Sequence, residues 1–455
     1  MSTPTRAERL CLAAAVCAGL FLRLLVLVNA PAIELDGISY ATMAEEFAHG
    51  HFGRALHSVF PPLYPLVTGL FHLAIPDVEL AGRLSSLAVG MVLIYVSFRF
   101  AKRVLGRTDK AVWLAFLVAF QPYLVRYSGQ VLSESLATLL FTVTVLAFYQ
   151  GWQEGRRSPL VISGFCLALT YLTRPEYLVF YAPFILLLGM RRRILDSLLV
   201  LLPFIALGSL YICYLRLQTG VWTVSGKASL SPFVAVGAFF GNVPLVAYEF
   251  FIALFPLFFL FAIFGFRRVA APYGRLVLLL VIFHVASLSF VSHATRRYSV
   301  EFVPLCMIIS VEGIYAVSGY LRRFFPRYPV SLALVAVIVC STVFQSFAPP
   351  HPGRGFHKSA GLFLLKHDPG SVVAARLPLA AFYEKGRSVD LLSEMSGERN
   401  MARFRSIVSE KRVKYLIFDE EMEKELPFLS DYLSKYVPVC AFRDKDAFVR
   451  VYGLS

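Results

Sequence analysis

The sequence predicts a polytopic α-helical membrane protein that carries a small α/β domain at its C-terminal end. Of its 455 residues, 57% are hydrophobic and only 16% are charged, with a mean hydropathy of +0.66. A soluble globular domain is nearer half apolar and about a quarter charged. Apolar runs near the roughly 20 residues that cross a bilayer recur up to residue 350, whereas residues 351–455 are polar.

About eleven apolar segments within residues 1–350 are candidate transmembrane helices. Several of them are short or closely joined, so this number can change by one or two. The segments lie near residues 10–30, 84–101, 111–126, 131–150, 159–173, 175–190, 194–216, 246–266, 276–292, 300–319 and 329–348. Residues 1–350 are therefore predicted to form the membrane domain.

Basic side chains gather in alternate loops between these segments, and loops rich in Lys and Arg remain cytoplasmic. The N-terminus is then cytoplasmic, and the first loop (31–83) and residues 351–455 face the outer side of the cytoplasmic (inner) membrane. This placement accounts for the net charge of +15 without any nucleic acid. The basic loops contain Arg6 and Arg9; Arg99, Lys102, Arg103, Arg107 and Lys110; Arg156 and Arg157; Arg191, Arg192 and Arg193; Arg267, Arg268 and Arg275; and Arg322, Arg323 and Arg327.

A cleaved signal peptide is the competing interpretation of the first apolar segment, with Arg6 and Arg9 before it and "NAPA" (29–32) as a cleavage site. The segment is long for a signal peptide and contains Arg23, which favours a transmembrane helix. An unpaired charge at this depth costs about 2.5–3.5 kcal/mol on insertion scales. Arg23 is therefore expected to face the helix bundle or a wet cavity.

The cysteines favour neither a disulfide framework nor a zinc site. Six of the seven lie in the predicted spans, Cys440 lies in the polar tail, and no CxxC pair exists. Glu34 and Asp36 offer oxygen ligands for a divalent cation, although two carboxylates alone are a weak signal. No cofactor is predicted as required, and the sequence does not decide whether a divalent cation binds.

Residues 351–455 alternate helical and β-rich runs after the Pro/Gly-rich stretch "APPHPGRG" (348–355). The runs "KSAGLFLLKH", "ARFRSIVSEKR" and "EMEKELPFLSDYLSKY" favour helices, whereas "SVVAA", "VKYLIF", "PVCAF" and "FVRVYG" favour strands. The pattern predicts a small α/β domain ending in a hairpin near residues 444–446. It contains no phosphate-binding loop, which favours a supporting or acceptor-docking role.

The first outer loop begins with "ELDGISYATMAEEFAHG" (34–50), which is rich in carboxylates. Asp36-Gly37 indicates a turn. Tyr40, Met43 or Ala44, and Phe47 follow at helical spacing until Gly50 offers a stop. Asp36 is therefore expected at the start of a short helix. It either caps that helix, which is worth about 1 kcal/mol, or acts as a base toward an attacking hydroxyl. Glu34 is a further candidate for such a base.

Six sequence stretches, taken in their order along the chain, resemble those of bacterial membrane glycosyltransferases of the protein-mannosyltransferase and aminoarabinose-transferase group. The resemblance covers about residues 10–310, and its weight comes from the order of the stretches because no single motif is strict. They are "ELDGISYATMAEEF", "HSVFPPLYPLVTGL", "GRLSSLAVG", "YSGQVLSESLATLLF", "LTRPEYLVF" and "SHATRRYSVEFVPL".

The resemblance implies a GT-C fold, in which an outward cavity accepts a sugar from a polyprenyl-phosphate carrier. It also implies that an acid of the first external loop is the catalytic base, and Asp36 matches that position. The family often has Asp-Glu here, whereas this chain has Asp36-Gly37 with Glu34 two residues earlier. The acceptor is expected to be a lipid, a glycan or a protein, and the sugar is not specified.

Transfer from a lipid phosphate also needs cations for the leaving group, and arginine suits phosphate because its planar fork bonds two oxygens at once. Each arginine has the alternative of extending to lipid headgroups. The candidates at the outer ends of the spans are Arg83, Arg174, Arg296 and Arg297, with Tyr298 as a hydroxyl donor.

Four further residues are predicted to line the cavity or contact the acceptor. Glu134 matches a recurrent acid of the family and either orients substrate or pairs with Arg126. The doubled proline of "FPPLYP" fixes the loop beside Tyr64. His57 lies near the place where relatives carry a basic residue, and Tyr40 lies on the helix that Asp36 begins.

A transporter or flippase is the alternative class, because many spans with buried charges also mark substrate pathways. Against this class, the two halves of the membrane domain show no internal sequence repeat. The polar residues also concentrate at the outer ends of the spans. A membrane scaffold is the third interpretation, and it leaves Asp36 and the arginines unexplained. The sequence therefore favours a glycosyltransferase.

Overall fold

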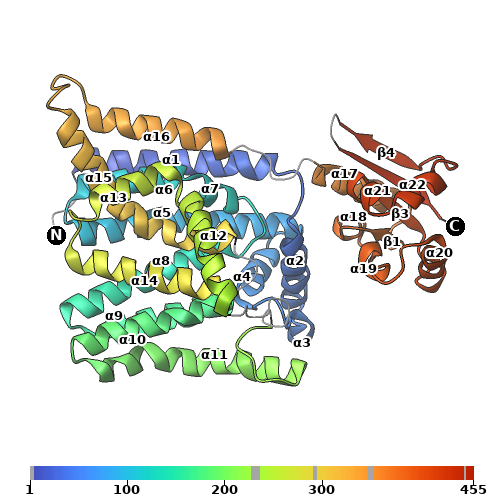
Figure 1. Ribbon diagram of the computed structural model, residues 1–455, viewed down its shortest axis with the longest axis horizontal. Helices are drawn as coiled ribbons and strands as arrows, with labels where there is room; N and C mark the ends of the chain where they lie inside the picture. The colour runs from blue at the N-terminus through green and yellow to red at the C-terminus, as the bar shows by residue number, and fades with distance from the viewer. Residues whose placement is uncertain (1–4, 227–235, 291–294, 347–352, 445–446, 455) are drawn as a thin grey trace. The chain divides into compact units, whose positions relative to one another are not determined.

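The computed structural model describes residues 5–226, 236–290, 295–346, 353–444 and 447–454 (Figure 1). It separates into two compact units. The first comprises residues 1–28 and 40–347, and the second comprises residues 29–39 and 348–455. The first unit is helical and the second contains a five-stranded sheet, so the predicted fold class is confirmed.

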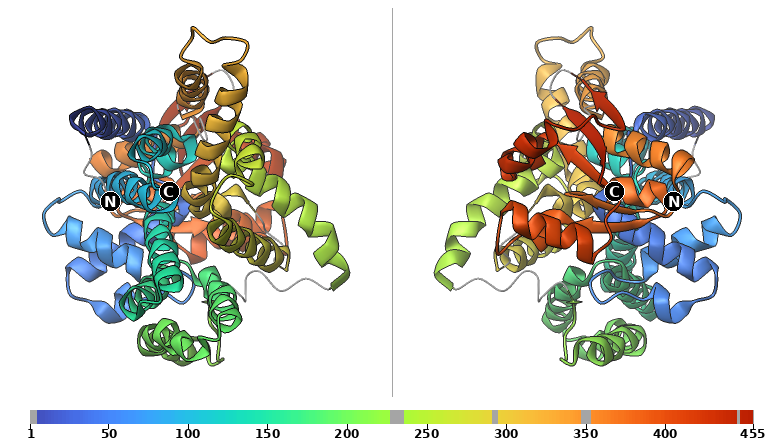
Figure 2. Two further views of the ribbon diagram at one scale, coloured as in Figure 1. Left: turned by 90° about the vertical axis from the view of Figure 1, so that its left-hand side faces the viewer. Right: turned by 90° about the vertical axis from the view of Figure 1, so that its right-hand side faces the viewer.

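The long helices of the first unit run side by side in a bundle, and α2, α3 and α4 lie across one end of it (Figures 1 and 2). Within the bundle α8 packs against α9, α9 against α11, and α5 against α6. The elements are α1 (Arg6–Asn29), α2 (Leu35–Ala48), α3 (Phe52–Ala55), α4 (Leu63–His72), α5 (Val78–Leu105), α6 (Thr108–Phe120), α7 (Pro122–Tyr127), α8 (Glu134–Glu154), α9 (Arg157–Thr173), η1 (Pro175–Phe180), α10 (Tyr181–Met190), η2 (Ile194–Asp196), α11 (Ser197–Thr219), α12 (Val236–Leu254), α13 (Pro256–Gly265), α14 (Ala271–Ser289), η4 (Arg296–Phe302), α15 (Val303–Leu321) and α16 (Val330–Ser346).

Among the described residues, 6 helical segments are long and apolar enough to cross a membrane, and one bent helix pair makes a seventh. The bend of 95° separates Ala238–Leu254 from Pro256–Gly265. It occurs where Phe255 adopts a positive φ of 71° and Pro256 begins the next helix, because proline disfavours a helical residue before it. Other predicted spans are shorter helices, so the number eleven stays a prediction.

Two glycines let α13 and α15 approach each other backbone to backbone. A Cβ atom on Gly265 would collide with the carbonyl oxygen of Ile309, and one on Gly313 would collide with that of Phe261. Small residues at helix contacts permit such close packing, which stabilises helix pairs in a membrane through van der Waals contact. This contact joins the second half of the bent pair to the helix that follows Arg296 and Arg297.

Arg23 is fully buried, as the sequence analysis expects. Its guanidinium donates hydrogen bonds to the carbonyl oxygens of Ala119 (2.9 Å) and Gly19 (3.1 Å) and to the hydroxyl of Ser128 (3.3 Å). The last carbonyls of a helix have no partner within that helix, and α6 ends at Phe120. Arg23 therefore satisfies the end of α6 and joins α1 to the α6–α7 break.

The second unit contains a mixed sheet with strand order β2-β1-β3-β5-β4. Strand β1 pairs in parallel with β2 and β3, whereas β3–β5 and β5–β4 are antiparallel. The strands are β1 (Val372–Ala375), β2 (Arg387–Asp390), β3 (Tyr415–Asp419), β4 (Cys440–Arg443) and β5 (Phe448–Gly453); the helices are α17 (Arg354–His367), α18 (Leu379–Glu384), α19 (Leu391–Glu394), α20 (Met401–Glu410), α21 (Glu420–Glu425) and α22 (Pro427–Leu433).

Alternating side chains of this sheet form two apolar layers. Val373 and Ile417 pack with α17 and α18 on one face, while Ala374 and Leu416 pack with α19 to α22 on the other, as the two-residue period of a strand requires. The four predicted strands are present. Residues 445–446 of the predicted hairpin turn lie outside the described residues. Elements β2, α18 and α19 were not predicted from the sequence.

Asp419 ties three elements of the second unit together. Its carboxylate accepts a hydrogen bond from the backbone N–H of Met422 (2.7 Å) and lies 3.2 Å from His357 and 3.3 Å from Arg376. Burial alone raises the pKa of a carboxyl group, but these donors outweigh it and hold the pKa of Asp419 below its usual value. The charged carboxylate thereby caps α21 and links it to α17.

Candidate functional site

Asp36 lies in the first turn of α2, where the sequence analysis places it. The helix begins with a hydrogen bond from the N–H of Ile38 to the carbonyl of Glu34 (3.1 Å), and the positive end of its dipole favours an acid there. Tyr40 and Met43 of the same helix are buried. The chain leaves the helix at Gly50, whose φ of 75° is in the left-handed region, so the element has the predicted extent.

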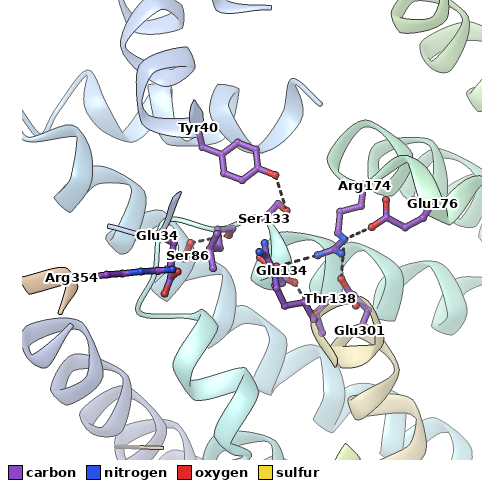
Figure 3. Close-up of polar contacts among 12 residues, drawn as sticks. Glu34, Tyr40, Ser86, Ser133, Glu134, Thr138, Arg174, Glu176, Glu301 and Arg354 are labelled. Atoms are coloured by element: carbon purple, nitrogen blue, oxygen red, sulfur yellow. Dashed lines mark hydrogen bonds and ion pairs between the residues drawn. The ribbon is translucent and has the colours of Figure 1, made fainter. Parts of the chain in front are cut away.

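Glu34 forms an ion pair with Arg354, the first residue of α17 (Figure 3). The Glu34 side chain is 19% exposed and that of Arg354 15% exposed. An ion pair so shielded from water is stronger than one on the surface. The Glu34 carboxylate is therefore engaged in a contact within the second unit.

Two arginines and three glutamates of the first unit form an ion cluster, named the buried ion cluster after its buried members Arg174, Glu134 and Glu301. The partly exposed Arg297 and Glu176 complete it. Glu134 Oε1 lies 2.5 Å from Arg297 Nε and 3.3 Å from Arg174 Nη1. Arg174 Nε lies 2.7 Å from Glu176 Oε1 and 3.4 Å from Glu301 Oε1. Figure 3 shows Arg174 pointing toward all three carboxylates, which come from α8, η1 and η4.

The buried ion cluster fixes the geometry of two predicted phosphate ligands. Glu134 and Glu301 are fully buried, and Arg174 is 5% exposed. Removing such charges from water costs several kcal/mol per ion and requires close partners. Arg174 already contacts three carboxylates, so its geometry favours holding the cluster together over direct phosphate binding. In the structure Glu134 pairs with Arg174 and Arg297 and not with the alternative partner, Arg126.

Arg296 and Arg297 are the more accessible cations of this region, with side chains 47% and 36% exposed. Arg296 lies 3.2 Å from Glu249 of α12 and donates a hydrogen bond to the hydroxyl of Tyr123 (3.3 Å). Each arginine therefore has a structural partner and still reaches the surface. Adjacent exposed guanidinium groups held in place can bind phosphate oxygens through paired N–H groups.

Two other predicted phosphate ligands have structural contacts in the membrane unit. Arg83 is 6% exposed; it forms an ion pair with Glu79 and donates to the carbonyl of Leu27 (2.8 Å) at the end of α1. The ring of Tyr298 lies 4.8 Å from the guanidinium carbon of Arg174, within the range of a cation–π interaction. Their roles toward phosphate stay predictions.

Tyr40 and Tyr64 pack edge to face, with ring centroids 5.1 Å apart. The Tyr40 hydroxyl donates to Ser133 (3.3 Å), and that of Tyr64 lies 2.9 Å from Ser86. Both rings are buried, and burial raises the pKa of Tyr64 to about 12. Tyr40 thereby joins α2 to the residue before α8, and Tyr64 joins α4 to α5. The place of Tyr64 at the cavity rim stays a prediction.

His57 shapes the loop before the doubled proline. Its Nδ1 atom accepts hydrogen bonds from the backbone N–H groups of Val59 (3.0 Å) and Phe60 (3.3 Å). Partial desolvation lowers the pKa of His57 below its usual value, which favours the neutral ring that such acceptance requires. The predicted role of His57 at the cavity stays a prediction.

Several residues of this region were missed from the sequence. Glu301 and Glu176 complete the buried ion cluster, while Glu249 and Tyr123 hold Arg296. An acid inside an apolar segment is itself a signal of a functional or paired group, and Glu301 lies in the segment 300–319. Glu249 lies in the segment 246–266 and carries the same signal.

Among the residues that the structure describes, no group of three or more His, Cys, Asp or Glu side chains is placed to hold a metal ion.

Part of the chain matches a known protein family. Residues 59–215 match the family of dolichyl-phosphate-mannose-protein mannosyltransferases. None of the curated protein sequences compared with the chain matches it.

Solved structures resemble the chain over nearly its whole length. ArnT from Cupriavidus metallidurans matches with a TM-score of 0.62 and 14% identity in the apo state, covering 96% of this chain and 97% of ArnT. The chain has the GT-C fold. The same protein bound to undecaprenyl phosphate gives a TM-score of 0.61, 14% identity and the same coverage.

The oligosaccharyltransferase of Archaeoglobus fulgidus, in complex with Zn and sulfate, gives a TM-score of 0.58 and 12% identity, covering 91% of this chain and 68% of that protein. The predicted resemblance to GT-C membrane glycosyltransferases and the predicted enzyme class are therefore confirmed. The family match includes Tyr64, Arg83, Glu134 and Arg174 and begins after the segment that carries Asp36.

Proposed function

We propose that this GT-C protein is an inverting glycosyltransferase that moves a sugar from a polyprenyl-phosphate donor to a hydroxyl or amine of an acceptor. The observation that carries the proposal is the GT-C fold together with an acid in the first turn of the helix that follows the first span. ArnT, which shares the fold, has been solved with undecaprenyl phosphate, and this supports a polyprenyl-phosphate donor.

In the proposed reaction Asp36 accepts the proton of the acceptor group as its oxygen or nitrogen attacks the anomeric carbon. The attack comes from the face opposite the phosphate, so the configuration at that carbon inverts. The bond between the anomeric carbon and the phosphate oxygen breaks, and its electron pair stays with the polyprenyl phosphate. Arg296 and Arg297 stabilise that negative charge. The leaving phosphate needs no protonation, so one base suffices.

Glu34 is the second candidate base, and its carboxylate forms an ion pair with Arg354. Glu134 is assigned to orienting Arg297, from which it lies 2.5 Å away. The acceptor classes are a lipid, a glycan or a protein. The proposal assigns neither the sugar nor a metal ion.

The experiment that tests the function is a transfer assay with purified protein and a panel of labelled polyprenyl-phosphate sugars and membrane acceptors. One donor is expected to lose its sugar to an acceptor, with inversion at the anomeric carbon and release of polyprenyl phosphate. A protein that moves labelled carriers across vesicle membranes without breaking the sugar–phosphate bond would instead be a transporter or flippase.

Donor affinity should depend on the accessible arginine pair. The double substitution of Arg296 and Arg297 by Gln is expected to weaken donor binding at least about 10-fold, since each charge-assisted hydrogen bond contributes about 1.5–3 kcal/mol. The matched control replaces Arg322 and Arg323 by Gln, an adjacent basic pair on the predicted cytoplasmic side. Equal donor affinities of the two double variants, measured by titration in detergent, would assign Arg296 and Arg297 to lipid headgroups.

The proposed site faces the outer side of the cytoplasmic membrane, with the N-terminus in the cytoplasm. In a background without exposed native cysteines, an impermeant thiol reagent should label Gly53→Cys and Ser396→Cys in intact cells. Ser158→Cys should react only after the membrane is broken. All three positions are exposed, so accessibility within the protein does not explain a difference. Labelling of Ser158→Cys alone would reverse the orientation.

A further inference from the structure

The segment Asn29–Ser39 connects α1 to the start of α2 and carries Asp36. It belongs to the same compact unit as residues 348–455, whereas the rest of α2 belongs to the helical unit. The two parts of the second unit are more than 300 residues apart in the sequence. The residues that hold this segment therefore come from the C-terminal part of the chain.

Two side chains of the C-terminal part hold Glu34 and Ile33, which lie two and three residues before Asp36. Arg354 of α17 forms an ion pair with the carboxylate of Glu34, whose backbone carbonyl accepts the first hydrogen bond of α2. The hydroxyl of Tyr383, in α18, accepts a hydrogen bond from the backbone N–H of Ile33 (2.8 Å). Ile33 is 1% exposed and Tyr383 is 9% exposed, so water competes little for this hydrogen bond.

The Tyr383 ring is itself held in place. Lys358 of α17 lies with its Nζ atom 4.7 Å from the ring centroid, within cation–π range. Helices α17 and α18 pack against each other through an apolar layer with the sheet that includes Ala360 and Ala380. Ile33 and Glu34 are thus attached to a packed α/β core and not to a free loop.

We propose that Arg354 and Tyr383 are positioning residues for catalysis, which fix the start of α2 and thereby the direction of the Asp36 carboxylate. This inference rests on the proposed role of Asp36 as the base. Asp36 follows Glu34 by two residues in a rigid helical turn, so displacement of Glu34 moves its carboxylate as well. A general base must lie about 2.6–3.2 Å from the proton it removes, and a misplacement of about 1 Å can cost about 100-fold in rate.

By this inference the C-terminal unit contributes to catalysis by positioning the Asp36 carboxylate. If Arg354 and Glu34 form only a structural link, their loss should lower stability and leave the rate of the folded protein unchanged. If they position Asp36, their loss should lower kcat while donor binding stays intact, because the accessible arginine pair is in the other unit. The two interpretations therefore differ in which kinetic constant changes.

The test compares Arg354→Gln, Tyr383→Phe, the exchanged pair Glu34→Arg with Arg354→Glu, and the control Arg387→Gln, an exposed arginine on β2. For each full-length variant, kcat, donor Kd and hydrogen–deuterium exchange of residues 29–39 are measured. We expect kcat to fall at least about 10-fold in Arg354→Gln and Tyr383→Phe, with Kd within about 2-fold and faster exchange in residues 29–39. The exchanged pair should recover part of kcat.

Faster exchange in residues 29–39 with kcat equal to that of Arg387→Gln would overturn the positioning role. Failure of the exchanged pair to exceed Arg354→Gln in kcat would count against the ion pair in the same way. Tyr383→Phe removes only one hydroxyl group, so it keeps the test valid if Arg354→Gln does not fold. An active Asp36→Asn protein would remove the proposed base, whatever the exchange of residues 29–39 shows.

Discussion

Asp36→Asn is expected to lower turnover by about 100-fold or more, the usual scale for loss of a general base. Asparagine keeps the size of the side chain, and loss of a charge in the first turn removes a dipole interaction worth only about 0.3–1 kcal/mol, so α2 should remain folded. Only the proton acceptor is lost. Donor affinity should stay near that of the wild type, because the accessible arginines Arg296 and Arg297 are unchanged.

The matched control for this variant is Glu45→Gln, which neutralises an acid on the same helix. Glu45 lies on the partly exposed side of α2, and its loss should leave turnover within about 2-fold, as expected for a surface change. The readout is sugar transfer per folded enzyme, with the lipid donor saturating. A folded Asp36→Asn protein with a near wild-type rate would end the assignment, and Glu34→Gln would be the next variant.

The elements that carry the candidate site were largely predictable because they depend on local patterns. The spacing of Tyr40, Met43 and Phe47 and the glycine at residue 50 predict α2 with the extent that the structure has. The alternation of β-rich and helical runs after residue 351 predicts four of the five strands. Strand β2 was missed because "RSVD" has one apolar residue and three polar ones, too few to show a strand period.

The partners of the charged residues were not predictable, because they are distant in sequence. Glu34 and Arg354 are separated by 320 residues, and Glu134 and Arg297 by 163. No periodicity links such positions, and a charge at the end of a span has the same sequence signal whether it binds substrate or another side chain. Arg83 and Arg174 illustrate this: both were predicted as phosphate ligands, and both contact carboxylates in the structure.

The buried ion cluster predicts which of these arginines the protein depends on for stability. Arg174→Gln would leave Glu134 with only Arg297 and leave Glu301 without the arginine that lies 3.4 Å from it. Removing one partner from a buried ion pair costs about 3–5 kcal/mol, because the remaining charge stays desolvated. Arg174→Gln should therefore unfold at a markedly lower temperature than the wild type, and donor binding should weaken because Glu134, which holds Arg297, loses its second arginine.

The control for this prediction is Arg156→Gln. The Arg156 side chain is 66% exposed and lies 3.5 Å from Glu154, and an exposed pair of this kind contributes at most about 1 kcal/mol. Thermal unfolding of both variants in the same detergent measures the difference. Arg174→Lys should be intermediate, because it keeps the charge but loses the planar fork that contacts several carboxylates at once. If Arg174→Gln unfolds at the same temperature as Arg156→Gln, the cluster does not stabilise the fold, and Arg174 returns to the candidates for the donor phosphate.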